Sequence, residues 1–154
     1  MSKMIFLNLP VRDLAASTAF YVALGGTVNE QFSDEGATSI MLSETIIVML
    51  QTHERYRSYT QRPIGDARRE SQLLIALSAD SRDAVNALVD STVAAGGRAD
   101  PNPAQDHGFM FGRSIEDPDG YVWEATWVDM GAHAETVADG DGQQGRRARA
   151  RQAA

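Results

Sequence analysis

The residue with the clearest potential for chemistry is Glu124, which stands alone in a strand-like stretch near the end of the chain. Residues 117–120, Asp-Pro-Asp-Gly, precede it and are typical of a tight turn, because proline presets φ and glycine tolerates a positive φ. Alternation along the following strand puts Trp123 and Trp127 on one face and Glu124 on the other. In a curved sheet Glu124 would line a cleft and could transfer protons, whereas on a half-exposed strand it would simply face solvent.

Few other residues have the type and spacing that catalysis or metal binding needs. The chain has no cysteine, which excludes disulfides, thiolate metal ligands and cysteine nucleophiles. His53, His107 and His133 lie far apart and share no ligand spacing, so we expect them to be surface polar residues.

The elements that must position Glu124 follow from the spacing of apolar residues, which describes the same plan twice. The first half is predicted to hold a strand at 5–11, a helix at 14–24, and strands at 27–32, 37–42 and 45–51. The second half is predicted to hold a strand at 73–79, a helix at 82–95, a short strand or loop at 98–107, and a hairpin of 108–115 with 121–128.

Two similar helix ends support this repeat, since Val-Ala-Leu-Gly-Gly at 22–26 matches Val-Ala-Ala-Gly-Gly at 93–97. Each half alone leaves a bare sheet edge and a half-covered sheet, so two halves together complete a core. The sequence therefore predicts an α+β fold in one domain, residues 4–129, with modules at 4–51 and 73–129. Residues 52–72 form a connector, and residues 130–154 lack apolar periodicity and are predicted to be a disordered tail.

Composition and charge argue against some classes of binding partner. The formal net charge is −7, which does not suit a nucleic-acid backbone or an anionic membrane. No stretch approaches about 20 apolar residues, and the first residues enter a strand pattern at once rather than a signal peptide. We therefore expect a cytoplasmic protein that binds no nucleic acid and no membrane.

Several motifs in order resemble the vicinal oxygen chelate superfamily, which includes glyoxalase I, extradiol dioxygenases, and bleomycin- and fosfomycin-resistance proteins. They are Val-Arg-Asp-Leu at 11–14 with Ser17, Phe20 and Tyr21, the Leu-Gly-Gly stop at 24–26, and the turn at 117–120 followed by Trp123-Glu124. The resemblance implies two tandem βαβββ modules whose curved mixed sheets surround a shared cleft. Since family members often pair sheet edges or exchange modules, it also implies a homodimer.

The resemblance places four metal ligands on the first and last strands of the two modules. The matching positions here are Phe6, Met49, Leu74 and Glu124. Only Glu124 has a donor suited to Mg²⁺, Mn²⁺, Fe²⁺ or Zn²⁺. We therefore expect neither a metal nor another cofactor, which argues against lactoylglutathione lyase and dioxygenase activity.

Strand alternation also predicts a mostly apolar cleft with a few separated polar groups. Its predicted members are Phe6, Asn8, Met49, Gln51, Leu74, Ala76, Glu124 and Thr126. Such a surface suits a small organic ligand, aromatic or, given the acidic body, cationic. The alternative is that three apolar members, Phe6, Met49 and Leu74, pack together and fill the cleft.

Three functions are compatible with this cleft. The first is a glyoxalase- or bleomycin-resistance-like protein that binds a small organic compound without metal. The second is a metal-independent isomerase or lyase, in which burial among Phe6, Met49 and Leu74 makes Glu124 a usable general base near neutral pH. The third, a metal-dependent glyoxalase or dioxygenase, applies if the predicted strand register is wrong. The sequence leaves open whether the two modules pair within one chain or across a dimer.

Overall fold

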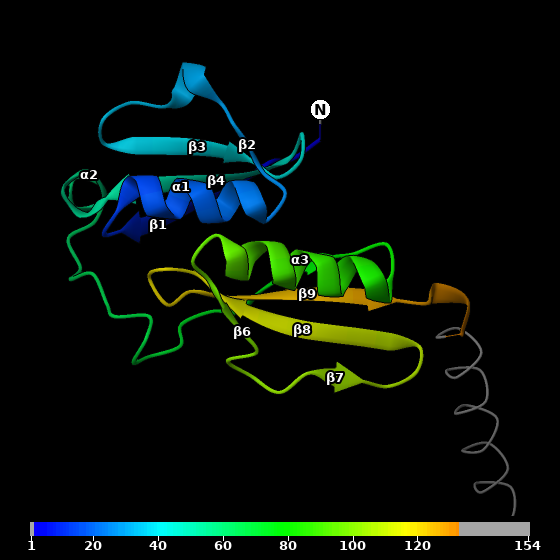
Figure 1. Cartoon of the computed structure of the whole chain (residues 1–154). Coiled ribbons are helices and arrows are strands. Elements are labelled where there is room, and N and C mark those ends of the chain that lie inside the picture. The colour runs from blue at the N-terminus through cyan, green and yellow to red at the C-terminus, as the bar shows by residue number, and fades with distance from the viewer. Residues whose placement is uncertain (1, 133–154) are drawn as a thin grey trace, which may run out of the picture.

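The computed structural model describes residues 2–132, and within this range the chain forms two modules of the same plan (Figure 1). Residues 133–154, including His133 and nearly all of the predicted disordered tail, lie outside the described range. The first residues of that tail are ordered, because Asp129 accepts hydrogen bonds from the amides of Gly131 and Ala132 and starts a helical turn.

Module one contains β1 (Ile5–Val11), α1 (Leu14–Ala23), β2 (Thr27–Val28), the 3-10 turn η1 (Glu30–Phe32), β3 (Ala37–Met41) and β4 (Ile46–Thr52). Its sheet has the order β1-β4-β3-β2, with β1 parallel to β4. Asp13 caps α1 by accepting the Ala16 amide at 2.9 Å, as its position predicts. The predicted strand at 27–32 is wrong beyond Val28, because the Asn29 side chain accepts the Gln31 amide and starts η1 instead.

Module two contains β5 (Ile75–Ser78), α3 (Arg82–Ala94), β6 (Arg98–Ala99), β7 (Gln105–Asp106), β8 (Met110–Glu116) and β9 (Val122–Val128). Its sheet has the order β5-β9-β8-β6, with β7 added to β8 and β5 parallel to β9. Ser81 caps α3 by accepting the Ala84 amide. Both sheets place the first strand beside the last, which confirms the predicted duplication and the α+β class with mixed sheets.

The paired glycines at the helix ends have two different functions. Gly25 and Gly96 adopt φ values of +104° and +99°, which glycine allows at no steric cost. Gly26 and Gly97 allow close packing, because a Cβ at Gly26 would lie 2.3 Å from the Ile40 Cγ2 atom. A Cβ at Gly97 would lie 2.5 Å from the Phe20 ring. The repeated motif thus ends each helix and lets the next strand pass close to the core.

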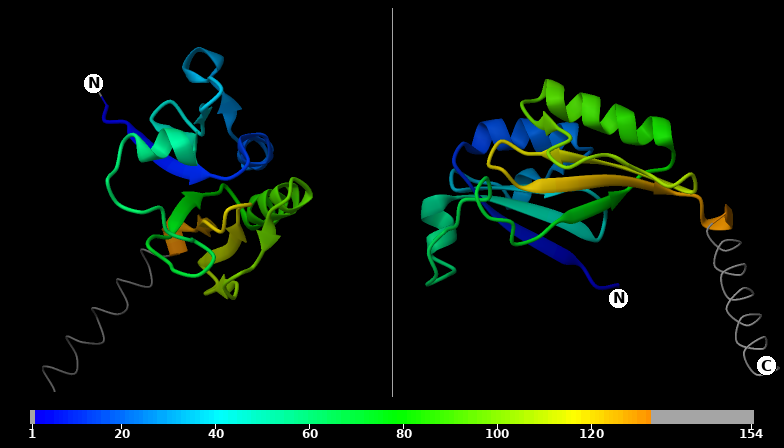
Figure 2. Two further views of the ribbon diagram at one scale, coloured as in Figure 1. Left: turned by 90° about the vertical axis from the view of Figure 1, so that its left-hand side faces the viewer. Right: turned by 90° about the horizontal axis from the view of Figure 1, so that it is seen from below.

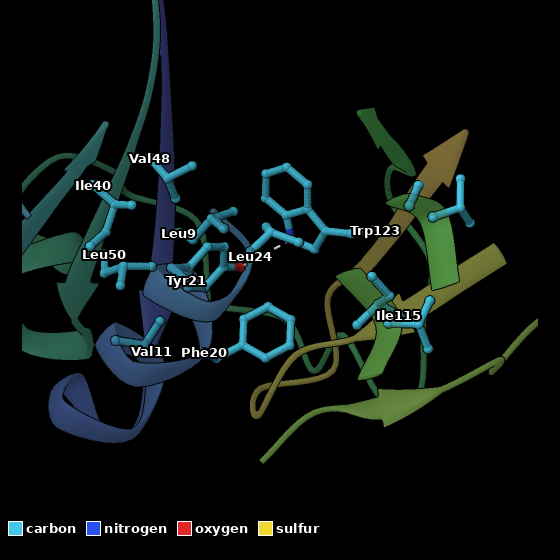
Figure 3. Packing of buried hydrophobic residues seen from close by; sticks show 13 residues of the cluster. Leu9, Val11, Phe20, Tyr21, Leu24, Ile40, Val48, Leu50, Ile115 and Trp123 are labelled. Atoms are coloured by element: carbon cyan, nitrogen blue, oxygen red, sulfur yellow. Dashed lines mark hydrogen bonds between the residues drawn. The ribbon is translucent and has the colours of Figure 1, made fainter. Parts of the chain in front are cut away.

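Helices α1 and α3 contact each other and lie on the same side of the two sheets (Figures 1 and 2). One core fills the space between helices and strands and draws residues from both modules. Trp123 is fully buried and reaches Tyr21, with ring centroids 5.7 Å apart and its Nε1–H donating to the Tyr21 hydroxyl (Figure 3). The predicted placement of Trp123 and Glu124 on opposite faces of the strand is confirmed, with Trp123 on the face that packs in the core.

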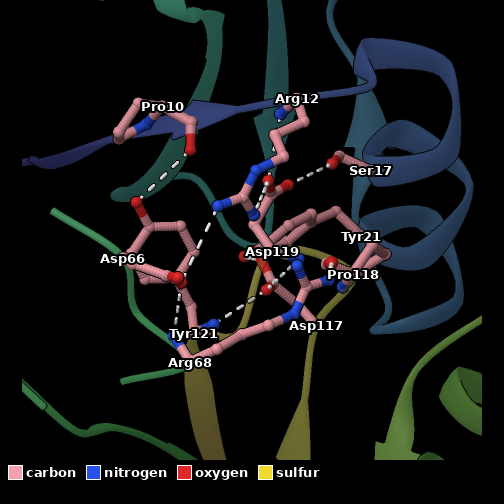
Figure 4. Close-up of polar contacts among 10 residues, drawn as sticks. All are labelled: Pro10, Arg12, Ser17, Tyr21, Asp66, Arg68, Asp117, Pro118, Asp119 and Tyr121. Atoms are coloured by element: carbon pink, nitrogen blue, oxygen red, sulfur yellow. Dashed lines mark hydrogen bonds and ion pairs between the residues drawn. The ribbon is translucent and has the colours of Figure 1, made fainter. Parts of the chain in front are cut away.

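The Asp-Pro-Asp-Gly turn between β8 and β9 joins the modules a second time (Figure 4). Asp117 accepts the amides of Asp119 and Tyr121 and also accepts the Tyr21 hydroxyl at 2.7 Å. Asp119 accepts the Arg12 amide at 3.0 Å and the Ser17 hydroxyl at 3.2 Å. The motifs at both ends of the chain therefore meet in one network that fixes module two against the start of α1.

The connector begins with the short helix α2 (His53–Arg57), which contacts β1 and β4, and continues without regular structure to β5. Thr52 caps α2 by accepting the Arg55 amide. Among the described residues, no helix has both the length and the apolar character that a membrane crossing requires.

Candidate ligand-binding site

The side of each sheet that faces away from α1 and α3 carries the predicted cleft residues. Leu9 and Val11 of β1 and Val48 and Leu50 of β4 are buried in the core, so their alternate neighbours point to the opposite face. In module two, Trp123 and Ala125 are buried in the same way, and Glu124 and Thr126 point away from the helices. We call these two surfaces the free faces of the sheets.

The larger of the two cavities lies between residues 8–10 of β1, the connector and the turn between β8 and β9. We call it the connector pocket; its volume is about 310 Å³. The strands and the turn contribute Asn8, Pro10, Tyr121 and Val122, and the connector contributes Tyr56, Ile64, Asp66 and Leu73. Both modules therefore share this pocket, and its volume is within the range of small-molecule sites.

The connector is held over this pocket mainly at residues 66–69. The Arg68 guanidinium donates to the Pro118 carbonyl oxygen, and Asp66 lies 3.7 Å from the Arg12 guanidinium (Figure 4). Gly120 permits this approach, since a Cβ there would lie 2.7 Å from the Arg68 backbone nitrogen. The turn that joins the modules therefore also positions one wall of the pocket.

An amide pair links the pocket lining to the buried part of β4. The Gln51 Nε2 donates to the Asn8 Oδ1 at 2.8 Å, and Asn8 borders the pocket. Gln51 is 4% exposed, and its Oε1 has no hydrogen-bond partner among the described residues.

Glu124 lies in a second, smaller cavity on the free face of sheet two. We call it the Glu124 hollow; its volume is about 250 Å³, and Gln105, Gly112, Ser114 and Thr126 line it together with Glu124. Ser114 of β8 and Ala76 of β5 are the register partners of Glu124 on either side. Within the part of the chain that the structure describes, the Glu124 carboxylate makes no hydrogen bond and no ion pair. It is thus available to a ligand.

The family model of the Glyoxalase/Bleomycin resistance protein/Dioxygenase superfamily matches residues 3–125. The chain belongs to this superfamily. The match covers both modules, confirms the resemblance drawn from the motifs, and agrees with the duplicated βαβββ plan. No curated protein matches the chain.

Several solved structures share the fold across most of the chain. A hypothetical protein SA1046 from S. aureus is 25% identical with a TM-score of 0.69, covering 82% of this chain and 95% of its own. A family enzyme from Burkholderia phytofirmans is 20% identical with a TM-score of 0.66, covering 82% and 99%. A bleomycin resistance determinant encoded on the transposon Tn5 is 18% identical with a TM-score of 0.57, covering 84% and 100%.

The metal site of the glyoxalase superfamily does not fit the residues found here. Phe6 lies on the free face of sheet one with 57% of its surface exposed, and Leu74, just before β5, is 53% exposed. Neither side chain has a donor atom, and the Met49 thioether is a poor ligand for hard or borderline divalent ions. Among the described residues no three His, Cys, Asp or Glu side chains gather where they could hold a metal ion.

The eight predicted cleft residues all lie on or beside the free faces, but only three of them line one of the two cavities. The connector pocket includes Asn8 of this set, and the Glu124 hollow includes Glu124 and Thr126. The expected burial of Glu124 among Phe6, Met49 and Leu74 is wrong, because none of the three lines its hollow. The reason is that β1 and β5 each pair on one side only, so the described sheets remain separate.

The connector residues of the pocket were missed by sequence reasoning, which treated 52–72 only as a link. Ile64 is an isolated apolar residue in a polar segment, and that contrast was the available signal for a contact with the domain. The histidines gave no site: His53 starts α2, and His107 lies in the loop between β7 and β8.

Proposed function

We propose that this glyoxalase-superfamily protein binds a small organic molecule with an apolar or aromatic body, without a metal ion, in the connector pocket. The observation that carries the proposal is a cavity of about 310 Å³ that both modules and the connector line with apolar side chains and a few polar groups. The lack of suitable donors at Phe6, Met49 and Leu74 supports a metal-independent function.

Charge favours a neutral or cationic ligand over an anionic one. The charged pocket residues are Arg62, Asp66 and Glu70, which sum to one net negative charge. The whole chain has the same sign at −7. An anion would therefore meet unfavourable potential on approach, whereas at the pocket Asp66 is already paired with Arg12 and Arg69.

Thermal-shift screening of small aromatic compounds tests the proposal, followed by mapping of the hits through backbone amide chemical shifts. We expect perturbations at 8–10, 56–73 and 120–122. Val122→Trp, which fills the pocket, should abolish them, whereas the matched change Val93→Trp on the exposed side of α3 should not. Hits that map elsewhere, or unchanged binding in Val122→Trp, would contradict the proposed site.

A second candidate function is a metal-independent isomerase or lyase that uses Glu124 as a general base. The supporting observation is that Glu124 faces a hollow with the hydroxyl-bearing Thr126 and the Gln105 amide. The test is proton exchange in D₂O on compounds that bind the hollow. Exchange should be lost in Glu124→Gln and retained in Glu44→Gln, which alters a carboxylate in the β3–β4 turn.

We also propose that the protein forms a homodimer. In the described chain β1 and β5 pair on one edge only. Exposed apolar residues lie at the start of β1 and just before β5: Ile5, Phe6, Leu73 and Leu74. Unpaired edges with apolar side chains favour association with a second copy. Sedimentation at micromolar concentration should give twice the chain mass, and a monomer would reject this proposal.

A further inference from the structure

The amide pair Asn8–Gln51 has a defined orientation. In the observed arrangement the Asn8 Oδ1 accepts from Gln51, and the Asn8 Nδ2 lies 3.4 Å from the Phe6 carbonyl oxygen. Turning the Asn8 amide around would bring its oxygen toward the Phe6 oxygen and place two acceptors against each other. It would also bring the Asn8 and Gln51 NH₂ groups together unless Gln51 turned as well. The Phe6 carbonyl oxygen and the Gln51 amide together therefore favour one orientation.

This orientation leaves a donor at the pocket. The Asn8 Oδ1 is used by the buried Gln51, whereas the Nδ2 has two hydrogens and, among the described residues, only one long contact, to Phe6. Asn8 is an exposed residue on the pocket lining, which also includes the apolar Pro10 and Val122. A ligand that covers Asn8 without an acceptor would remove water from this donor and leave it unpaired, so the donor contributes to specificity.

We propose that Asn8 donates its side-chain N–H to an oxygen acceptor of the ligand, so that the connector pocket selects neutral carbonyl compounds: ketones, esters or amides with an apolar body. Gln51 is a positioning residue that holds the Asn8 amide in the donor orientation from its buried place in β4. This inference rests on the proposed function, since it names the ligand class of the same pocket.

The burial of Gln51 supports this division of roles. An apolar side chain at position 51 would remove the 2.8 Å hydrogen bond to Asn8 and leave only the 3.4 Å contact to Phe6 to orient its amide. The buried glutamine is therefore associated with a fixed donor at the pocket. Fixing a polar group before the ligand arrives reduces the ordering that binding must supply.

Binding of 1-indanone and indane, measured by amide chemical shifts on the full chain, tests the proposal. The two probes share a rigid apolar body and differ in one carbonyl oxygen. We expect wild type to bind 1-indanone about fivefold more tightly than indane, the effect of one hydrogen bond. Asn8→Ala should reduce this ratio to about one while indane binding stays unchanged. Gln72→Ala, which removes another pocket amide, is the matched control and should keep the ratio.

Two further variants separate the roles of the pair. Asn8→Asp keeps the shape but removes the donor, so 1-aminoindane should replace 1-indanone as the preferred probe. Gln51→Leu should lower the ketone ratio without changing indane binding, an effect that general destabilisation would not produce. Probes that map to the pocket with the same ratio in wild type and Asn8→Ala would overturn this inference and leave the proposed function standing. Failure of every probe to perturb the pocket would contradict both.

Discussion

The Tyr21 hydroxyl donates to the Asp117 carboxylate at 2.7 Å, although 96 residues separate the two along the chain. Tyr21 belongs to α1 of module one and Asp117 to the turn of module two, and both are buried. The same hydroxyl accepts from Trp123, so one oxygen connects a helix, a turn and a strand. The turn that contains Asp117 also holds the connector, through Pro118 and Gly120. The Tyr21–Asp117 hydrogen bond is therefore linked to one wall of the connector pocket.

Tyr21→Phe should therefore lower the free energy of unfolding by about 2–4 kcal/mol, because it leaves a buried carboxylate oxygen and the Trp123 N–H unpaired. Urea denaturation measures the change. Tyr121→Phe is the matched control: its hydroxyl makes one long bond of 3.3 Å to the Pro10 carbonyl oxygen and is half-buried, so we expect a loss below about 1 kcal/mol. Equal losses of unfolding free energy in the two variants would show that the hydrogen bonds of Tyr21 do not stabilise the contact between the two modules.

Burial raises the pKa of Asp117 to about 6 from its ordinary value of 3.8, against the hydrogen bonds that favour its charged form. The folded state therefore keeps this proton over a pH range where the unfolded state has lost it. The contribution of Asp117 is fully present below pH 3.8 and is lost as the pH rises to about 6. This loss lowers the free energy of unfolding by an amount on the order of 2–3 kcal/mol and is complete near pH 6.5.

Asp117→Asn should remove this pH dependence. Urea denaturation gives the free energy of unfolding of wild type minus that of the variant. This difference should fall by about 2 kcal/mol as the pH rises from 4 to 7. Asp34 and Asp106 have pKa values lowered by hydrogen bonds from Arg55 and Arg82, so their contributions change at pH values below this window. A slope in Asp117→Asn that stays parallel to that of wild type would refute the assignment.

The sequence predicted the helices, strands and turns well, because the spacing of apolar residues and the residue types of turns are local properties of the chain. Alternation placed Trp123 on the core side and Glu124 on the free face, and the Asp-Pro-Asp-Gly turn forms where its residues predicted it. The one clear strand error lies at 29–32, where a side-chain cap outweighed weak strand propensity.

The candidate site was less predictable because it depends on long-range placement. The connector has no apolar period, so its return over Asn8 and its bonds to Pro118 could not be read from spacing. Likewise, alternation identified the face of Glu124 but not its neighbours. Only the three-dimensional structure shows that Ser114 and Gln105 surround it rather than Phe6 and Leu74.

Gly26→Ala should destabilise the fold although Gly26 does not require a positive φ. The added Cβ would lie 2.3 Å from the Ile40 Cγ2 atom and 2.8 Å from the Tyr21 carbonyl oxygen, so either the strand or the helix end must move. Overpacking of this kind costs about 1–3 kcal/mol, measured as a lower urea midpoint. Gly65→Ala, where nothing lies within 4 Å, is the control and should leave the midpoint unchanged.

Deleting residues 133–154 should leave the unfolding midpoint nearly unchanged. The shared core uses residues between Leu7 and Trp127, and the sequence after Asp129 has no apolar period that could extend it. Thermal unfolding of the truncated and full chains makes the comparison. A loss greater than about 2 kcal/mol would mean that the deleted segment packs on the domain.

Metal addition should not stabilise the protein. Of the four family ligand positions only Glu124 provides an oxygen donor, and an ion held there would depend on water for its remaining ligands. Equimolar Zn²⁺, Ni²⁺, Mn²⁺ or Fe²⁺ should leave the melting temperature unchanged, and elemental analysis should find well under one ion per chain. Glyoxalase I activity on the methylglyoxal–glutathione adduct should be absent with each ion.

A positive control for this prediction can be built on the free face of sheet one. Met49 pairs in register with Asn8, so Phe6 is its diagonal neighbour on β1. Phe6→His combined with Met49→Glu places two donors within reach of one ion and should produce a Zn²⁺-dependent rise in melting temperature. If wild type instead binds one ion per chain and Glu124→Gln loses it, the remaining ligands must come from residues outside the four positions, and the metal-independent function would be wrong.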